Sequence, residues 1–265
     1  MSIEKTEAIV LRAVNYRDSS KIVTFYTKRY GKMSAIAKGA RNPKSKFGSL
    51  FQPLNYLQIV FYRRESRQLQ YVSSSDFVRY FKSLTANVER FSIAMALIEI
   101  VNQVMHDEEE NERLFKLLVD SLEQLNEKET LPQNVFVHFG LHLAIDLGFS
   151  PNFENCLICK SRINLTGDNK KISYVIEKGA PLCETCASKI SGSFFLSKPA
   201  LSILRSFVGL NSEAAAKSKV EKALQNELSN FIFVYLRKHS ENLKEIKSLN
   251  VLRFSRLNEH LVERV

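Results

Sequence analysis

The chain has 265 residues, 45% of them apolar, and its 38 Lys and Arg against 28 Asp and Glu give a net charge of +10. This is enough material for one to three domains with buried cores. No run approaches the ~20 apolar residues of a membrane-spanning helix, and the charged start Met1–Lys5 is unlike a signal peptide, so we expect a soluble, cytoplasmic protein.

The positive charge is concentrated at the N-terminus. Residues 1–82 contain 16 Lys and Arg against 5 Asp and Glu, whereas the other 183 residues contain 22 against 23. An evenly solvated surface would spread these charges along the whole chain. Their concentration in the first third predicts a module that binds a polyanion such as nucleic acid.

Residues 1–82 have the pattern of a small β domain. Runs rich in β-branched and aromatic residues are separated by turn signals such as Tyr30–Lys32. The expected strands are Ala8–Leu11, Lys21–Thr27, Met33–Ala37, Leu54–Phe61 and Leu69–Val72. Five short strands in a basic domain favour an OB-type barrel, although counting strands leaves an SH3-like barrel open.

Two clusters of cations lie between these strands: the segment Lys38–Ser49, which we call the basic loop, and the turn before the fifth strand. The candidate DNA-binding residues are Lys38, Arg41, Lys44 and Lys46 in the loop, with Arg63, Arg64 and Arg67 at the turn. The aromatic residues nearby in sequence are Tyr16, Tyr26, Phe47, Tyr56 and Tyr62. Single strands are held by cations along the backbone and by rings that stack on bases, although some of these rings will serve the core.

From Ser83 onwards the apolar residues follow helical spacing. The expected helices pass through Phe91–Val101, Leu114–Leu125, Phe136–Leu147, Ser197–Phe207 and Lys217–Lys238. Gly148 and Pro151 are stop signals for the third helix. We expect the helices before and after the cysteine window to pack into one bundle.

All four cysteines lie in a window of 31 residues, as the pairs Cys156-x2-Cys159 and Cys183-x2-Cys186. Two intervening residues let both thiolates of a pair face one ion, and four soft ligands suit tetrahedral zinc. Reduced thiols or a redox pair are the alternative. Four cysteines complete the coordination sphere, so we predict one structural Zn²⁺ per chain. Lys170–Ile176 followed by Gly179 indicates a small hairpin between the pairs.

Sequence patterns of common enzymes are absent. The chain has neither a G-x-x-x-x-G-K-[ST] phosphate-binding loop nor a G-x-S-x-G nucleophile elbow. His138 and His142 are spaced like metal ligands on a helix, but Phe139 replaces the glutamate of a zinc protease, so structural histidines are favoured. The acidic run Asp107–Glu110 precedes a helix and suits its dipole. We therefore predict a protein without catalytic residues.

Several short segments are similar to one protein family. They are Glu7–Arg12, Tyr16–Asp18, Thr27–Gly31, Ala37–Arg41, Ser45, Gln52–Pro53, Leu147–Pro151 running into Cys156–Cys159, and Lys247–Leu249. Together they resemble the RecO family of bacterial recombination mediators. The resemblance spans nearly the whole chain, although the helical parts match only in pattern. Lys160 stands where many family members have glycine after the first cysteine pair.

The patterns and the resemblance together predict an α+β protein. Its N-terminal five-stranded OB-type β-barrel is followed by a helical bundle with an inserted zinc element that is held by four cysteines. The predicted domains are residues 1–82 for the nucleic-acid-binding barrel, 83–150 and 195–245 for the helical domain, 151–194 for the zinc element and 246–265 for the C-terminal tail.

The resemblance also implies a function. Such proteins bind single- and double-stranded DNA, anneal complementary strands and, with RecR, displace single-strand-binding protein (SSB) so that RecA can load. The C-terminal tail of SSB is then an expected partner of the helical bundle, and DNA binding implies association with the nucleoid. On the residues alone, a zinc-ribbon RNA-binding or transcription-associated protein stays open. A nuclease with a zinc ribbon is a weaker alternative, because we find no carboxylate cluster for Mg²⁺.

Overall fold

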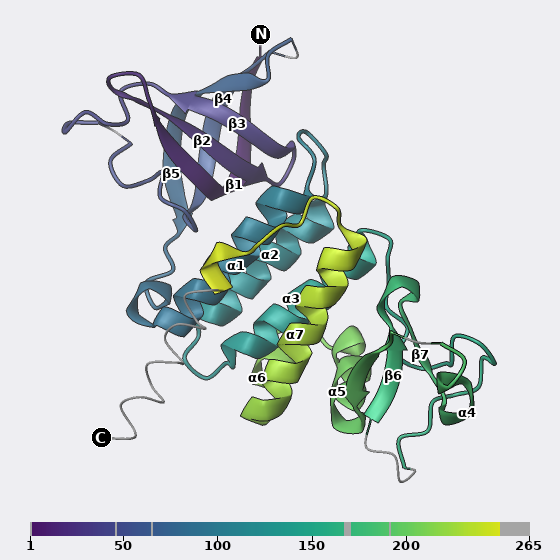
Figure 1. Ribbon diagram of the computed structural model, residues 1–265. Coiled ribbons are helices and arrows are strands. Elements are labelled where there is room, and N and C mark those ends of the chain that lie inside the picture. The colour runs from purple at the N-terminus through teal and green to yellow at the C-terminus, as the bar shows by residue number, and fades with distance from the viewer. Residues whose placement is uncertain (1, 46, 65, 167–170, 191, 250–265) are drawn as a thin grey trace. The chain divides into compact units, whose positions relative to one another are not determined.

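The computed structural model describes residues 2–45, 47–64, 66–166, 171–190 and 192–249 (Figure 1). The chain divides into two compact units, one formed by Met1–Asn126 with Glu245–Val265 and the other by Glu127–Lys244. The four domain ranges expected from the sequence stay predictions. Among the described residues, none of the helices has both the length and the apolar content that crossing a bilayer requires.

The first unit begins with a closed five-stranded barrel (Figure 1). Its strands are β1 Ser2–Tyr16, β2 Ser20–Thr27, β3 Gly31–Ala37, β4 Tyr56–Arg63 and β5 Leu69–Arg79. Their order around the barrel is β1-β2-β3-β5-β4, and β3 runs parallel to β5 whereas the other neighbours are antiparallel. A five-stranded closed barrel of this kind confirms the predicted OB-type fold class.

β1 is much longer than its predicted core, Ala8–Leu11. Its first half pairs with β4 and its second half with β2, and the register shifts between Val10 and Arg12. The two halves of this strand therefore pair with different neighbours to close the barrel, and a local break in register of this kind helps the strand to bend. The ends of β1 are mostly exposed and polar, so the apolar pattern could reveal only its buried centre.

The barrel interior is filled by alternate residues of the strands and by two rings from the segment between β3 and β4. Phe51 packs edge-on against Phe25 with ring centroids 5.9 Å apart, and Phe47 lies 4.9 Å from Phe51. All three rings are buried in one core cluster. The connection between β3 and β4 thus contributes rings to the core, while most of its described polar residues are exposed.

Two longer helices follow the barrel in the first unit, after a short turn of 3-10 helix, Leu84–Ala86. They are α1 Val88–Val104 and α2 Glu112–Asn126. The Asn87 side chain accepts a hydrogen bond from the backbone of Arg90 and so caps α1. The acidic run Asp107–Glu110 is exposed just before α2, which agrees with its interpretation as solvated charge.

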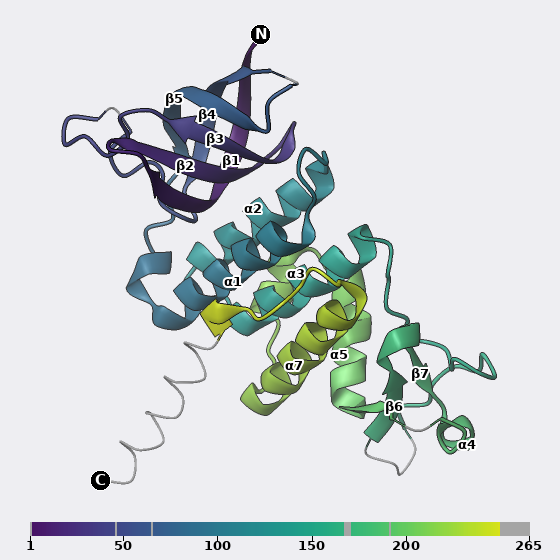
Figure 2. The same ribbon diagram turned by 45° about the horizontal axis from the view of Figure 1, so that its top comes forward.

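The second unit is built around α3. Its longer helices are α3 Pro132–Asp146, α5 Lys198–Gly209, α6 Ser212–Lys217 and α7 Lys222–His239. α3 contacts the other three, and α3 and α7 lie side by side in both views (Figures 1 and 2). Gly140 permits this approach, because a Cβ atom there would lie 2.2 Å from Cγ2 of Ile232. Helices from both sides of the cysteine window thus pack together.

The helix predicted for Lys217–Lys238 is confirmed over most of its length as α7, but its predicted start is wrong, because α6 ends at Lys217 and α7 begins five residues later. The side-chain amide of Asn134 donates hydrogen bonds to the carbonyls of Ala215 and Ser218, at 3.1 and 2.8 Å. A buried side chain from α3 therefore binds the carbonyls at this break. Nothing in the local apolar spacing signals that contact.

A small sheet carries the cysteine window. Its elements are β6 Lys171–Val175, the 3-10 turn Ile176–Lys178, β7 Ala180–Leu182, the short helix α4 Glu184–Ala187 and β8 Phe194–Ser197. The strand order is β7-β6-β8, with all pairs antiparallel. β6 and β7 form the expected hairpin, which turns at Gly179 with a left-handed φ of +61°.

Candidate metal centre and nucleic-acid interface

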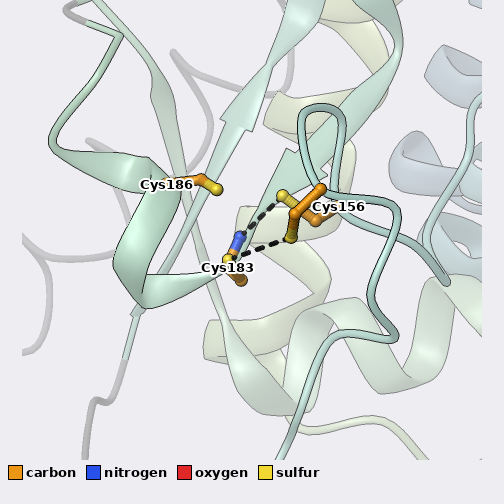
Figure 3. A group of neighbouring side chains, drawn as sticks. Cys156, Cys183 and Cys186 are labelled. Atoms are coloured by element: carbon orange, nitrogen blue, oxygen red, sulfur yellow. Dashed lines mark hydrogen bonds between the residues drawn. The ribbon is translucent and has the colours of Figure 1, made fainter.

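The four cysteines converge on one point. Their sulfur atoms all lie within 4.8 Å of one another. Figure 3 shows the side chains of Cys156, Cys183 and Cys186 turned toward a common centre. Four sulfurs at ~2.3 Å from one zinc ion would lie ~3.8 Å apart, so small adjustments of the side chains would complete a tetrahedral site. Within the described part of the chain no other group of three or more potential metal ligands converges in this way.

The first cysteine pair sits on a tight hairpin, Glu154–Ile163, which we call the knuckle hairpin. The amide of Ile163 donates to the carbonyl of Glu154 at 2.8 Å, and the amide of Cys156 donates to the carbonyl of Ser161 at 2.8 Å. Lys160 turns the chain with a φ of +61°, in the left-handed region that glycine adopts without strain. The lysine therefore occupies a position where the backbone itself favours the glycine of the family pattern.

The second pair is joined to the first by backbone hydrogen bonds. The amide of Cys183 donates to Sγ of Cys156 at 3.4 Å (Figure 3). The amide of Leu157 donates to the carbonyl of Pro181 at 2.8 Å. Cys183 directly follows β7, and Cys186 lies in α4. Backbone N–H groups aimed at a sulfur stabilise its thiolate form, which is the form that binds metal.

The thiols differ in their surroundings. Hydrogen bonds from the side chain and backbone of Ser161 lower the pKa of Cys159 to about 6, whereas burial raises the pKa of Cys186 to about 12. Four thiolates this close together repel one another unless a cation lies between them. The donor set and its spacing therefore fit a divalent soft-ligand ion such as zinc, with no position left for a substrate.

The candidate DNA-binding cations form a more scattered set. Lys38, Arg41, Lys44, Arg64 and Arg67 are exposed, and Arg63 is half-buried. Lys46 lies outside the described residues. The clearest convergence is on the half-buried ring of Tyr71 in β5, where Nζ of Lys38 lies 4.8 Å and Cζ of Arg67 lies 5.9 Å from the ring centroid. The parallel pairing of β3 with β5 brings these distant residues together.

The side chain of Gln70 forms hydrogen bonds with the backbone of the turn that carries Arg64 and Arg67. The side-chain oxygen of Gln70 accepts from the amide of Arg64 at 2.9 Å, and its nitrogen donates to the carbonyls of Arg64 and Arg67 at 3.1 and 2.6 Å. Gln70 is itself buried. This buried amide fixes the backbone of the turn while its two arginine side chains stay exposed.

Arg41 and Arg63 have partners that reduce their availability. The guanidinium of Arg41 donates to the carbonyls of Arg17 and Asp18 at 3.0 and 3.1 Å, so it joins the basic loop to the turn between β1 and β2. Arg63 lies with Cζ 4.9 Å from the ring centroid of Tyr30 and does not share the Tyr71 cluster. Of the predicted cations that the structure describes, Lys38 and Arg67 therefore come closest to forming one surface.

The aromatic residues chosen from the sequence are mostly core residues. Tyr26, Phe47 and Tyr56 are buried, whereas Tyr16 and Tyr62 are half-buried. The rings of these three buried residues are not accessible to bases, which agrees with the expectation that some of the rings serve the core. Tyr71 was not among those candidates. The available signal was that Tyr71 lies in the predicted strand Leu69–Val72, directly after the turn that carries Arg67.

The two histidines of α3 have structural partners. Nε2 of buried His138 lies 2.9 Å from the carbonyl of Leu210, Nε2 of His142 lies 3.4 Å from that of Phe207, and their ring centroids are 4.2 Å apart. The histidines thus join α3 to the end of α5 and the residue after it. This agrees with the structural role expected from the sequence.

Comparison with known proteins adds independent findings. The family "Recombination protein O N terminal" matches residues 1–81, and "Recombination protein O C terminal" matches residues 86–249. The chain is 31% identical over 254 residues to the DNA repair protein RecO of Chlorobium limicola, covering 94% of this chain and 97% of that protein. The RecO proteins of Salinibacter ruber (37% over 173 residues, 65% of both chains) and Thermoanaerobacter sp. (28% over 241 residues, 91% and 94%) are also similar.

Proposed function

The chain belongs to the RecO family of DNA repair and recombination proteins, and from this membership we propose that it binds single- and double-stranded DNA, anneals complementary strands and helps to load RecA onto SSB-coated DNA. The observation that carries the proposal is the convergence of Lys38 and Arg67 on Tyr71, on the most basic third of the chain. Cations beside a partly exposed aromatic ring are the combination that binds single strands.

DNA binding is proposed for the loop-flanked side of the barrel. The basic loop is tied through Arg41 to the turn between β1 and β2, and Lys38 lies over the same ring as Arg67 from the turn between β4 and β5. OB-type barrels use the loops at these two positions to flank their nucleic-acid site. The exposed side chain of Lys44 adds a further cation to the same loop.

No bond-making chemistry is needed for this function. Annealing requires that the charge of two phosphate backbones be neutralised and that bases stay accessible, and a binding surface can supply both. In this proposal the four cysteines hold one structural Zn²⁺, which would supply folding free energy to the cysteine window rather than activate water. The residues that would hold it are Cys156, Cys159, Cys183 and Cys186.

The partner proteins of this proposal are RecR, RecA and the acidic, apolar C-terminal tail of SSB. A pocket of about 340 Å³ in the first unit offers a candidate place for an apolar side chain of that tail. Phe115 and Val119 contribute apolar surface, and the charged residues of the lining are Lys28, Arg113 and Lys116 with Glu7 and Glu112. Saturable binding of a fluorescent tail peptide, weakened by Arg113→Glu, would support this assignment. Unchanged binding of the peptide in that variant would mean that the tail binds outside this pocket.

An annealing assay on complementary DNA strands pre-coated with SSB tests the central proposal. We expect the purified protein to accelerate duplex formation without added nucleotide. An RNA-binding protein would instead prefer RNA loops and ends and would leave the coated DNA strands apart. Metal-dependent shortening of the strands would favour the nuclease alternative.

A further inference from the structure

The side chain of Arg205, in α5, lies at the open end of the knuckle hairpin. Its Nε donates to the carbonyl of Phe153 at 2.9 Å, and its Nη2 lies 3.2 Å from the carbonyl of Ile163 and 3.4 Å from that of Glu154. One guanidinium thus binds backbone carbonyls on both strands of the hairpin. Only 14% of the side chain is exposed.

We propose that Arg205 is a positioning residue for the metal centre: it holds the knuckle hairpin closed, so that the thiolates of Cys156 and Cys159 face the second pair before the ion binds. The inference rests on the proposed zinc site. It goes beyond the site itself because Arg205 contributes no ligand and belongs to a helix that follows the cysteine window.

The path from Arg205 to the sulfurs is short and consists of hydrogen bonds. Within the hairpin, the amide of Ile163 binds Glu154, and the amide of Cys156 binds Ser161. The hydroxyl of Ser161 lies 3.0 Å from Sγ of Cys159. A fixed hairpin base therefore fixes the direction of both ligands, as outer residues do around many metal sites.

The guanidinium shape matters for this role. Arginine presents several N–H donors in a planar fork, whereas the ammonium of lysine is a compact charge on a flexible stem. Lysine at position 205 could keep an ion pair with Glu154, whose Oε1 lies 3.5 Å from Nε of Arg205. It could not span the carbonyls of both strands in the same way. Arg205→Lys therefore separates hairpin closure from charge.

Two residues provide matched controls. Arg162 pairs with the same Glu154 at 3.3 Å, but 79% of its side chain is exposed, so Arg162→Lys changes the charge pair without opening the hairpin base. Ser197 caps α5 by accepting a hydrogen bond from the amide of Ala200 at 3.2 Å. Ser197→Ala should weaken α5 while leaving the contacts of Arg205 in place.

The experiment measures zinc transfer from the full-length protein to a chromogenic chelator, beside the thermal stability of each variant. We expect Arg205→Lys and Arg205→Met to weaken zinc binding by about 10- to 100-fold, the usual cost of losing an outer-shell partner. Arg162→Lys should match the parent protein. Ser197→Ala should lose thermal stability while keeping its zinc affinity.

Each outcome has a distinct meaning. If the parent protein binds no zinc, the proposed metal site fails and Arg205 has no such role. If the parent binds zinc and both Arg205 variants release it at the parent rate, the site stands and the positioning role is overturned. Equal losses of zinc affinity in Arg205→Lys and Ser197→Ala would also overturn it, because helix stability alone would then explain the effect. Should Arg205→Met fail to fold, Arg205→Lys decides.

Discussion

The metal centre and the cationic face of the barrel are held in different ways. The cysteines lie on two short segments whose backbones are tied together, and Arg205 ties the first of these segments to α5. The cations around Tyr71 come from separate loops and keep exposed, charged ends. A coordination site requires fixed directions over ~2.3 Å, whereas a phosphate backbone is attracted over a Debye length of ~10 Å. Loss of a single ligand should therefore abolish metal binding, whereas loss of successive cations should lower the affinity for DNA step by step.

Cys156→Ser should have the largest effect. Loss of one buried thiolate removes the metal, and structural zinc contributes binding free energy of order 10 kcal/mol to the folding of small fingers. We expect metal-free protein in which the second unit unfolds at lower temperature. The barrel has its own core and should stay folded. Metal analysis with calorimetry tests this, and a variant that keeps full metal content and stability would contradict the site.

Removal of cations from the barrel should weaken DNA binding in steps. Each phosphate contact on a single strand contributes roughly −0.7 to the slope of log affinity against log salt. A variant that replaces four cations of the basic loop by Gln should therefore flatten the slope by up to about 3. Its affinity should fall alike for DNA of every sequence. The four residues are Lys38, Arg41, Lys44 and Lys46. Fluorescence anisotropy at several salt concentrations measures both quantities.

A matched set of four lysines controls for net charge. It consists of Lys217, Lys219, Lys222 and Lys238, which lie in or next to α6 and α7. Gln at these positions removes the same charge from the second unit and should weaken DNA binding far less. A larger loss from this set than from the basic loop would assign the DNA to the helices instead.

The sequence allowed the metal ligands to be predicted more fully than the DNA surface, for a physical reason. Two Cys-x2-Cys pairs specify their chemistry locally, so the spacing was enough to name all four converging sulfurs. The ring of Tyr71 meets Lys38 only through the parallel pairing of β3 with β5, a contact that no local pattern encodes. Likewise, the role of Arg205 depends on a helix that returns to the hairpin from outside the cysteine window.

Tyr71→Ala should separate stacking from charge. Stacking of a base on an aromatic ring contributes roughly 1–3 kcal/mol, and the lost ring carries no charge. We expect about 5- to 150-fold weaker binding of single strands at an unchanged salt slope, with a smaller loss for duplex, whose bases are not exposed. Tyr71→Phe keeps the ring and should bind nearly as the parent does. An equal loss for single strands and duplex would show that Tyr71 only positions Lys38 and Arg67.

The smallest effect on DNA is expected from Arg63, although the sequence places it beside Arg64 and Arg67. Its guanidinium lies over Tyr30, whose hydroxyl donates to Glu4 at 2.6 Å. The hydrogen bond from Tyr30 is the main cause that lowers the pKa of Glu4, and the charge of Arg63 is the weakest of those that act on it. Arg63 thus belongs to a local network at one strand end.

Arg63→Gln and Arg67→Gln remove the same charge a few residues apart, so they form a direct test. Arg67→Gln should weaken DNA binding and flatten the salt slope by roughly 0.7 for one lost contact, whereas Arg63→Gln should leave both nearly unchanged. The pH of acid unfolding should instead change in Arg63→Gln and not in Arg67→Gln. Because the pKa of Glu4 is lowered in the folded state, its contribution is present above pH ~4.5 and is lost as the pH falls through the lowered value. Arg63→Gln should raise that pKa slightly and move acid unfolding to slightly higher pH, while Arg67→Gln should not. Equal losses of DNA affinity in the two variants would mean that the DNA runs along the whole turn rather than over Tyr71.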